Sequence, residues 1–221
     1  MKQYYLRQSN SDRLLLIFAG WATDERLFSS FKYYERCDVC VVSNYVDHDF
    51  DLKLLERYKS IRVFAWSLGV FMAEVLLHHT SLPIEKVVAL NGTLMPVDDE
   101  KGIPKAIYEG TSKNLTDASL FKFFRRMCGA TPNKDLLPGF RSDLPLVTLK
   151  QSLDFVEELS LKKRFDANDT IFNSVVLGTK DGIFPMVNMM HGWEGFTNLQ
   201  FIDAPHFDSD LIQQLMYGAC C

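Results

Sequence analysis

Three residues of this 221-residue chain, Ser67, Asp181 and His206, are of the types that cooperate in nucleophilic catalysis. A serine hydroxyl is a weak nucleophile at neutral pH, so it needs an imidazole to accept its proton and later to protonate the leaving alcohol. A carboxylate can hold that imidazole in the required tautomer and stabilise its protonated form. Together these residues predict cleavage of an ester through a covalent intermediate.

Ser67 stands where the sequence pattern changes from strand to helix. Residues 61–65 are β-branched or aromatic for the most part, and apolar residues recur at helical spacing in residues 69–79. The small residues Ala65 and Gly69 allow strand and helix to approach closely, which pushes the serine side chain out of the corner. The helix would also direct its N-terminal amides and positive dipole end at this corner. An ordinary strand-to-helix turn is the alternative interpretation of this short motif.

The rest of the chain alternates between strand and helix patterns, which predicts a mostly parallel sheet with helices on both faces. Residues 4–6 and 14–18 flank the turn-forming residues 9–12 and predict an N-terminal β-hairpin. The second of these strands is apolar at every position, as in a strand covered on both faces. Further strands are predicted at 39–43, 61–65, 86–91, 173–178 and 199–202, and helices at 52–58, 69–79 and 207–217.

Catalytic groups of an open parallel sheet gather beyond the carboxyl ends of its strands. Ser67, Asp181 and His206 each follow shortly after the end of a predicted strand. Their chain order, Ser, Asp, His, is that of the α/β-hydrolases and differs from the two common serine-protease orders. The alternatives are that Asp181 is only a turn residue before Gly182 and that His206 is an ordinary loop histidine.

Residues 95–168 interrupt the alternation, because they carry no strong strand pattern but two helical ones, at 115–128 and 144–164. A helical insertion between two strands is a common way to build a lid over a site. With 47% hydrophobic residues, the chain can bury one large core. We therefore expect a single α/β domain over residues 1–221, with a helical lid at about 95–168.

The composition excludes several classes of protein. No apolar stretch approaches the roughly 20 residues that span a bilayer, and residues 1–5 do not begin a secretory signal, so we expect a cytoplasmic protein without membrane contact. The net charge of −4 argues against a nucleic-acid-binding surface. Five cysteines, an odd number, fit a reducing compartment better than a disulfide framework.

Cys37 and Cys40 have the C-x-x-C spacing of some redox and metal sites. They lead into a strand-like run, however, and neither a second cysteine pair nor a flanking histidine accompanies them. Metal-ligand spacing is absent from the rest of the sequence as well. We therefore expect no metal and no cofactor.

Residues 18–24 are Phe-Ala-Gly-Trp-Ala-Thr-Asp, and residues 65–69 are Ala-Trp-Ser-Leu-Gly. In these two stretches and in its small size, the chain resembles the BioG-type pimeloyl-carrier-protein methyl esterases of the α/β-hydrolase superfamily. Those enzymes hydrolyse the methyl ester of pimeloyl attached to acyl carrier protein during biotin synthesis. The superfamily resemblance covers essentially the whole chain and implies the α/β-hydrolase fold and a Ser-His-Asp triad. It also implies an oxyanion hole made by the backbone N–H groups of Trp21 and Leu68.

Carrier proteins are acidic, so an acidic hydrolase would need a local cationic face to bind one. Lys122, Arg125 and Arg126 lie at i, i+3 and i+4 and would share one face of a helix. Arg141 and residues 162–164 would extend that face. A solvated amphipathic helix is an equally valid interpretation. The same helix carries three phenylalanines that either line an acyl site or pack in the core: Phe121, Phe123 and Phe124.

Other functions use the same fold and the same three residues. A thioesterase, or a lyase of the menaquinone-pathway type, would apply them to a different bond. A hydrolase-fold binding protein would have no catalysis at all. The sequence favours an esterase acting on a carrier-bound substrate over these alternatives.

Overall fold

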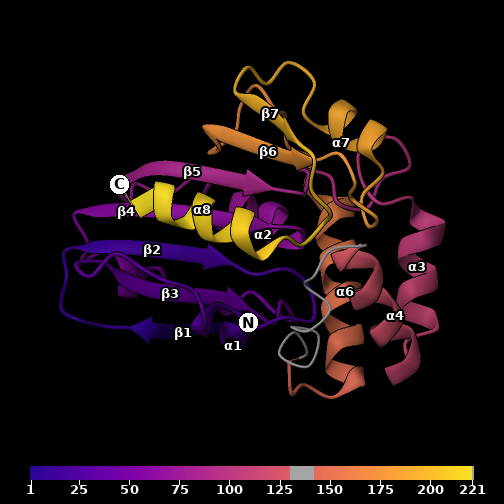
Figure 1. Cartoon of the computed structure of the whole chain (residues 1–221), viewed down its shortest axis with the longest axis horizontal. Coiled ribbons are helices and arrows are strands. Elements are labelled where there is room, and N and C mark those ends of the chain that lie inside the picture. The colour runs from indigo at the N-terminus through magenta and orange to yellow at the C-terminus, as the bar shows by residue number, and fades with distance from the viewer. Residues whose placement is uncertain (130–141, 221) are drawn as a thin grey trace.

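The computed structural model describes residues 1–129 and 142–220, which contain a seven-stranded sheet in the order β1-β3-β2-β4-β5-β6-β7 (Figure 1). Neighbouring strands from β3 to β7 run parallel, and β1 alone is antiparallel to its neighbour. This confirms the predicted mostly parallel sheet. The strands are β1 (Lys2–Arg7), β2 (Arg13–Phe18), β3 (Asp38–Ser43), β4 (Ser60–Trp66), β5 (Ile84–Leu90), β6 (Ser174–Gly178) and β7 (Leu199–Ile202).

Helices cover the sheet on both faces, as predicted. Both α2 and α8 contact β2 and β4, and Figure 1 shows α8 in front of the sheet with α2 behind it. The α-helices in the described part of the chain are α1 (Glu25–Ser29), α2 (Leu68–Leu77), α3 (Lys105–Lys113), α4 (Asp117–Cys128), α6 (Leu146–Lys162), α7 (Met186–Gly192) and α8 (Ser209–Cys220). The helix expected at 52–58 is a shorter 3-10 turn, η1 (Leu52–Leu55).

The predicted N-terminal β-hairpin is wrong. Strand β1 pairs with β3, where Lys2 lies opposite Ser43, and it does not pair with β2. Both edges of β2 are occupied by parallel neighbours, β3 on one side and β4 on the other. The apolar strand β2 is buried from Leu14 to Phe18, so it belongs in the middle of the sheet. Strand β1 therefore adds to the free edge of β3.

In the described part of the region 95–168, α4 and α6 were predicted from the sequence and α3 was not. The patterns at 115–128 and 144–164 correspond to α4 and α6. Thr116 and Ser119 form a capping box at the start of α4, and Gly129 with φ of 59° ends it. The unpredicted α3 is nine residues long and has a glycine in its interior, which weakens the helical pattern.

We call residues 95–168 the helical insertion; in Figure 1 its helices α3, α4 and α6 lie beside the carboxyl ends of the strands. The Tyr108 hydroxyl on α3 donates to the Leu153 carbonyl on α6 at 3.0 Å. The last turn of α4 is tied to the loop between β7 and α8, because the Phe207 amide donates to the Met127 carbonyl at 3.0 Å. The helical insertion thus lies where a lid would lie, and its action as a lid stays a prediction.

Candidate active site

Ser67 occupies a strained corner between β4 and α2. Its φ of 61° and ψ of −130° lie outside the usual regions for a residue with a side chain. The corner is tight: a Cβ added at Gly69 would lie 2.4 Å from the Phe18 carbonyl oxygen, and one at Gly92 would lie 2.3 Å from the Ser67 carbonyl oxygen. Because only glycine fits at these two positions, neighbouring strands and the helix can close around the serine. Strain of this kind is typical of functional sites.

The structure brings Ser67, His206 and Asp181 into one hydrogen-bonded row. His206 Nε2 lies 2.9 Å from Ser67 Oγ, and His206 Nδ1 lies 2.7 Å from Asp181 Oδ2. With the proton on Nδ1, the ring donates to the carboxylate, and Nε2 is left to accept the serine proton. Ser67 is 5% exposed and His206 is fully buried, so water hardly competes for these bonds.

The second oxygen of Asp181 fixes the carboxylate in place. Asp181 Oδ1 accepts hydrogen bonds from the backbone amides of Ile183 at 2.7 Å and Phe184 at 3.0 Å. The Phe184 ring also stacks on the His206 ring, with centroids 5.9 Å apart and an angle of 13° between the planes. The turn after β6 therefore orients both the carboxylate and the imidazole.

Two other carboxylates near His206 in sequence serve different contacts. Asp203 pairs with Lys180, with 2.8 Å between Oδ1 and the amine. Asp208 Oδ1 accepts from the Leu211 amide at 3.0 Å and so caps α8. Asp181 is thus the carboxylate that the fold directs at the imidazole.

Two anchoring residues, Trp66 and Asn91, were not identified from the sequence. Trp66 Nε1 donates to the His206 carbonyl at 2.9 Å. Asn91 Nδ2 donates to the carbonyls of Pro205 at 3.0 Å and His206 at 2.9 Å, and its Oδ1 accepts from the Gly178 amide at 2.6 Å. Asn91 also adopts a positive φ of 48°, which asparagine tolerates better than most residues. An Asn-Gly pair directly after a buried strand was the available signal.

Trp21 and Leu68, the predicted oxyanion residues, line the same pocket as Ser67. Leu68 is the first residue of α2, so its amide has no carbonyl partner within the helix. The side chain of Trp21 links this loop to the helical insertion: Nε1 donates to the Leu149 carbonyl at 3.0 Å, and the ring packs edge-on against Phe123 at 5.0 Å.

The Ser67 pocket has mostly apolar walls and about 390 Å³ of empty space, its open mouth included. Most of its wall comes from α3, α4 and α6. The α3 side of the pocket was not predicted from the sequence, because α3 itself was not predicted. The lining residues are Trp21, Ser67, Leu68, Ile103, Ile107, Tyr108, Thr111, Phe123, Arg126, Leu153 and Ile183.

A wider groove between α3 and α4, here called the outer groove, continues from this pocket. Its empty space, open solvent included, is about 940 Å³. The Ser67 pocket and the outer groove share Trp21, Ile107, Thr111, Phe123 and Arg126. The remaining lining residues are Ala106, Gly110, Asn114, Leu115, Ser119, Leu120 and Lys122.

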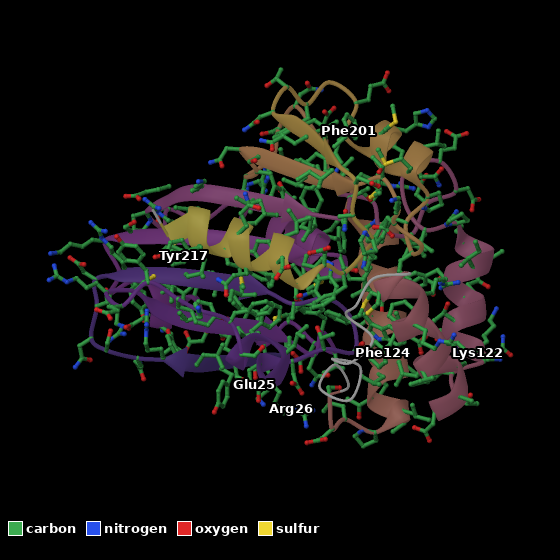
Figure 2. The ribbon with its side chains drawn as sticks, viewed as in Figure 1. Glu25, Arg26, Lys122, Phe124, Phe201 and Tyr217 are labelled. Carbon is green, nitrogen blue, oxygen red and sulfur yellow. The ribbon has the colours of Figure 1, made fainter. Side chains whose placement is uncertain are left out.

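The predicted cationic face of α4 is divided in the structure. Lys122 and Arg126, one turn apart, both line the outer groove, whereas Arg125 is exposed outside it. Arg126 reaches the Ser67 pocket as well, with its guanidinium 6.0 Å from the centre of the Phe123 ring. Phe124 packs in the core, and Figure 2 shows it on the side of the helical insertion nearer the sheet, with Lys122 on the far side.

The predicted extension of this face has acidic partners of its own. Lys162 pairs with Glu158 on the preceding turn of α6, and Arg164 pairs with Asp98 at 3.0 Å. Arg141 lies outside the described residues. The structure therefore groups Lys122 with Arg126 and gives residues 162–164 no place in the outer groove.

Within residues 1–129 and 142–220, no group of three or more histidine, cysteine or acidic side chains is arranged to hold a metal ion. Over the same residues, none of the helices has the length and apolar character that crossing a bilayer requires.

Comparison with known families decides the family of the chain. The family model described as pimeloyl-ACP methyl esterase BioG matches residues 1–215. The chain belongs to the BioG family. The crystal structure of BioG from Haemophilus influenzae superimposes on this BioG-family chain with a TM-score of 0.84 and 29% identity, covering 98% of this chain and 97% of the other.

Two relatives share about a third of their aligned residues with this member of the BioG family. A malonyl-[acyl-carrier protein] O-methyltransferase of Bacteroides fragilis (strain 638R) is 35% identical over 204 residues. The alignment takes in 90% of this chain but 40% of that protein, so the chain spans about two fifths of its length. An uncharacterised protein of Haemophilus influenzae is 32% identical over 197 residues, with 89% of each chain covered.

More distant structures establish the fold alone. MenH from S. aureus has a TM-score of 0.63 at 14% identity, covering 99% of this chain and 96% of its own. An α/β-hydrolase-family protein from Desulfitobacterium hafniense has a TM-score of 0.60 at 14% identity, covering 97% and 98%. The BioG-family chain therefore has the predicted α/β-hydrolase fold.

Proposed function

We propose that this chain is a serine carboxylesterase that hydrolyses the methyl ester of pimeloyl-acyl carrier protein in biotin synthesis. The observation that carries the proposal is the row from Ser67 through His206 to Asp181 at the base of an apolar pocket. Membership of a family described as pimeloyl-ACP methyl esterases supports the substrate.

The proposed reaction needs no cofactor. Ser67 Oγ attacks the ester carbonyl carbon while His206 Nε2 takes the hydroxyl proton, and Asp181 stabilises the resulting imidazolium. The tetrahedral oxyanion accepts hydrogen bonds from the amides of Leu68 and Trp21, each worth a few kcal/mol in the transition state. His206 then protonates the departing methanol, and a water molecule activated by the same imidazole hydrolyses the acyl-enzyme.

The surroundings of the three residues fit an acyl chain on an anionic carrier. The apolar side chains of Ile107 and Phe123 border the path from Ser67 into the outer groove. Lys122 and Arg126 supply positive charge along that groove. Such charge would attract an acidic carrier protein and orient it, more than it would raise the affinity itself.

The proposal is tested first with Ser67→Ala. Hydrolysis of the carrier-bound methyl ester, measured as methanol released and acid formed, should fall by about 10⁴-fold or more, while the unfolding midpoint stays close to that of the parent. Growth of a biotin-requiring strain that lacks its own pimeloyl methyl esterase should depend on Ser67. If Ser67→Ala keeps the parent turnover, the assignment of the nucleophile is wrong.

The same assay separates the alternative functions. Release of the carrier thiol in place of methanol would indicate a thioesterase. Absence of hydrolysis, together with absence of covalent labelling by a fluorophosphonate probe in the folded protein, would indicate a binding protein. Elimination from a menaquinone-type substrate, with no ester hydrolysis, would indicate a lyase.

Carrier binding is tested with Lys122→Glu, because Lys122 lines the outer groove but not the Ser67 pocket. This change should raise the KM for the carrier-bound ester and leave p-nitrophenyl acetate unaffected, and the effect should weaken at high salt. Lys59→Glu, at an exposed lysine paired with Asp12 before β4, is the control. Equal effects of Lys122→Glu on both substrates would reject carrier binding at this surface.

A further inference from the structure

Gly110 lies in the interior of α3 and lines the outer groove. It belongs to one face of the helix, whose other groove-lining members are Ala106, Ile107, Thr111 and Asn114. A Cβ built at Gly110 would meet no atom within 4 Å. The space that the missing side chain leaves is therefore open, and it lies on the groove side of α3.

Neither packing nor backbone conformation requires a glycine at this position. At Gly69 and Gly92 an added Cβ would collide with backbone, whereas at Gly110 it would not. The φ of Gly110 is also outside the positive range that favours glycine. A glycine in a helix interior is less favourable than alanine, so α3 gives up stability here without a steric reason from its own neighbours. An occupant of the groove would supply the reason.

The outer groove is continuous with the pocket that holds Ser67. Ile107 and Phe123 line both, and Ile107 is 48% exposed, so an apolar side chain faces the passage. Along α4 the groove runs from Arg126 to Ser119, which is about 10 Å of helix. This length and these walls fit an extended chain of several methylene groups.

We propose that Gly110 keeps the outer groove open for the acyl chain that joins the reacting ester to its carrier, and that position 110 determines the acyl length accepted. The inference rests on the proposed function for the identity of the carrier-bound ester. The ester carbonyl lies at Ser67, the chain passes over Gly110, and the anionic carrier lies toward Lys122.

The test is Gly110→Leu, which places a strong helix former in α3 and its side chain in the groove. The kcat/KM for p-nitrophenyl octanoate and for the carrier-bound methyl ester should fall by about tenfold or more, and that for p-nitrophenyl acetate by less than about twofold. The unfolding midpoint should equal or exceed that of the parent. Gly110→Ala should lower the kcat/KM for the same two long-chain substrates, but by smaller factors.

Gly218 offers a matched control, because a Cβ built there also meets nothing within 4 Å and the residue lies in α8. Gly218→Leu should leave all three substrates unaffected. The inference is overturned if Gly110→Leu affects acetate and octanoate equally, or affects neither. If the parent does not hydrolyse the carrier-bound ester, the proposed substrate is wrong, and the acetate and octanoate pair still decides the role of Gly110.

Discussion

Asn91 is the residue whose replacement tests most directly how the fold positions His206. Its side chain joins the end of β6, shortly before Asp181, to the loop that carries His206, since it donates to the carbonyls of Pro205 and His206 and accepts from the amide of Gly178. Asn91 is itself 1% exposed. Asn91→Ala would remove one hydrogen-bond partner from each of these three backbone groups in a buried site, although the His206 carbonyl would keep the bond from Trp66 Nε1.

The expected loss of stability follows from these bonds. The three hydrogen bonds are each worth about 1 kcal/mol net, so Asn91→Ala should lower the free energy of unfolding by roughly 3 kcal/mol. The positive φ of 48° adds a backbone penalty of about 1 kcal/mol for alanine that glycine does not have. Asn91→Gly should therefore be the more stable of the two variants.

The effect on catalysis should exceed what the loss of stability explains. A domain of ordinary stability, about 5–15 kcal/mol, stays folded after such a loss. Without Asn91, the loop that carries the His206 imidazole would lose two of its hydrogen bonds. A misplacement of the imidazole by about 1 Å would lower kcat by about 100-fold. Chemical unfolding gives the stability, and p-nitrophenyl acetate hydrolysis below the unfolding transition gives kcat.

Asn188→Ala is the control for general destabilisation. Asn188 is also buried and donates to two backbone carbonyls, those of Asp99 and Gly102, and within the described part of the chain it has no hydrogen bond to the loop that carries His206. It should lower stability by about 2 kcal/mol and leave kcat near that of the parent. Full kcat in Asn91→Ala, or an equal loss of activity in Asn188→Ala, would show that Asn91 does not position His206.

Three further measurements test other parts of the structure. Trp21→Phe removes the hydrogen bond to the Leu149 carbonyl but keeps an aromatic ring. The kcat should therefore fall about fivefold for short and long esters alike, with KM unchanged. A loss confined to long esters would contradict this. Burial opposes ionisation of Asp38, but hydrogen bonds from Ser9, Tyr58 and Ser11 outweigh it and hold the pKa of that carboxyl below its ordinary 3.8. The contribution of the Asp38 carboxylate to stability is therefore present above about pH 4 and is lost as pH falls through the lowered pKa. In urea unfolding, the free energy of unfolding of Asp38→Asn should differ from that of the parent at pH 7, and the two values should converge in acid. Burial raises the pKa of Glu74 above 4.5, although a hydrogen bond from Thr170 acts to lower it. The free energy of unfolding should therefore decline as pH rises through that raised pKa. Glu74→Gln should make this decline smaller in the same unfolding assay.

The local features of this protein follow from the sequence alone. The change from strand to helix at Ser67, the apolar run from Leu14 to Phe18 and the periodic pattern of α6 each depend on residues close together in the chain. Backbone sterics and the periods of 2 and 3.6 residues act over that range, so the pattern predicts them. The fold class followed from their alternation, and the structure and its relatives confirm it.

Which distant segments meet depends on tertiary packing. Strand β1 joins β3 and not the adjacent β2, because both edges of β2 are already paired. The anchors of His206 come from Trp66 and Asn91, which are more than a hundred residues away in the chain. The open side of Gly110 becomes part of a groove only because α3 and α4 lie on either side of it. Such contacts depend on which sheet edges and helix faces remain free after the core has packed. A local sequence pattern does not predict which ones these are.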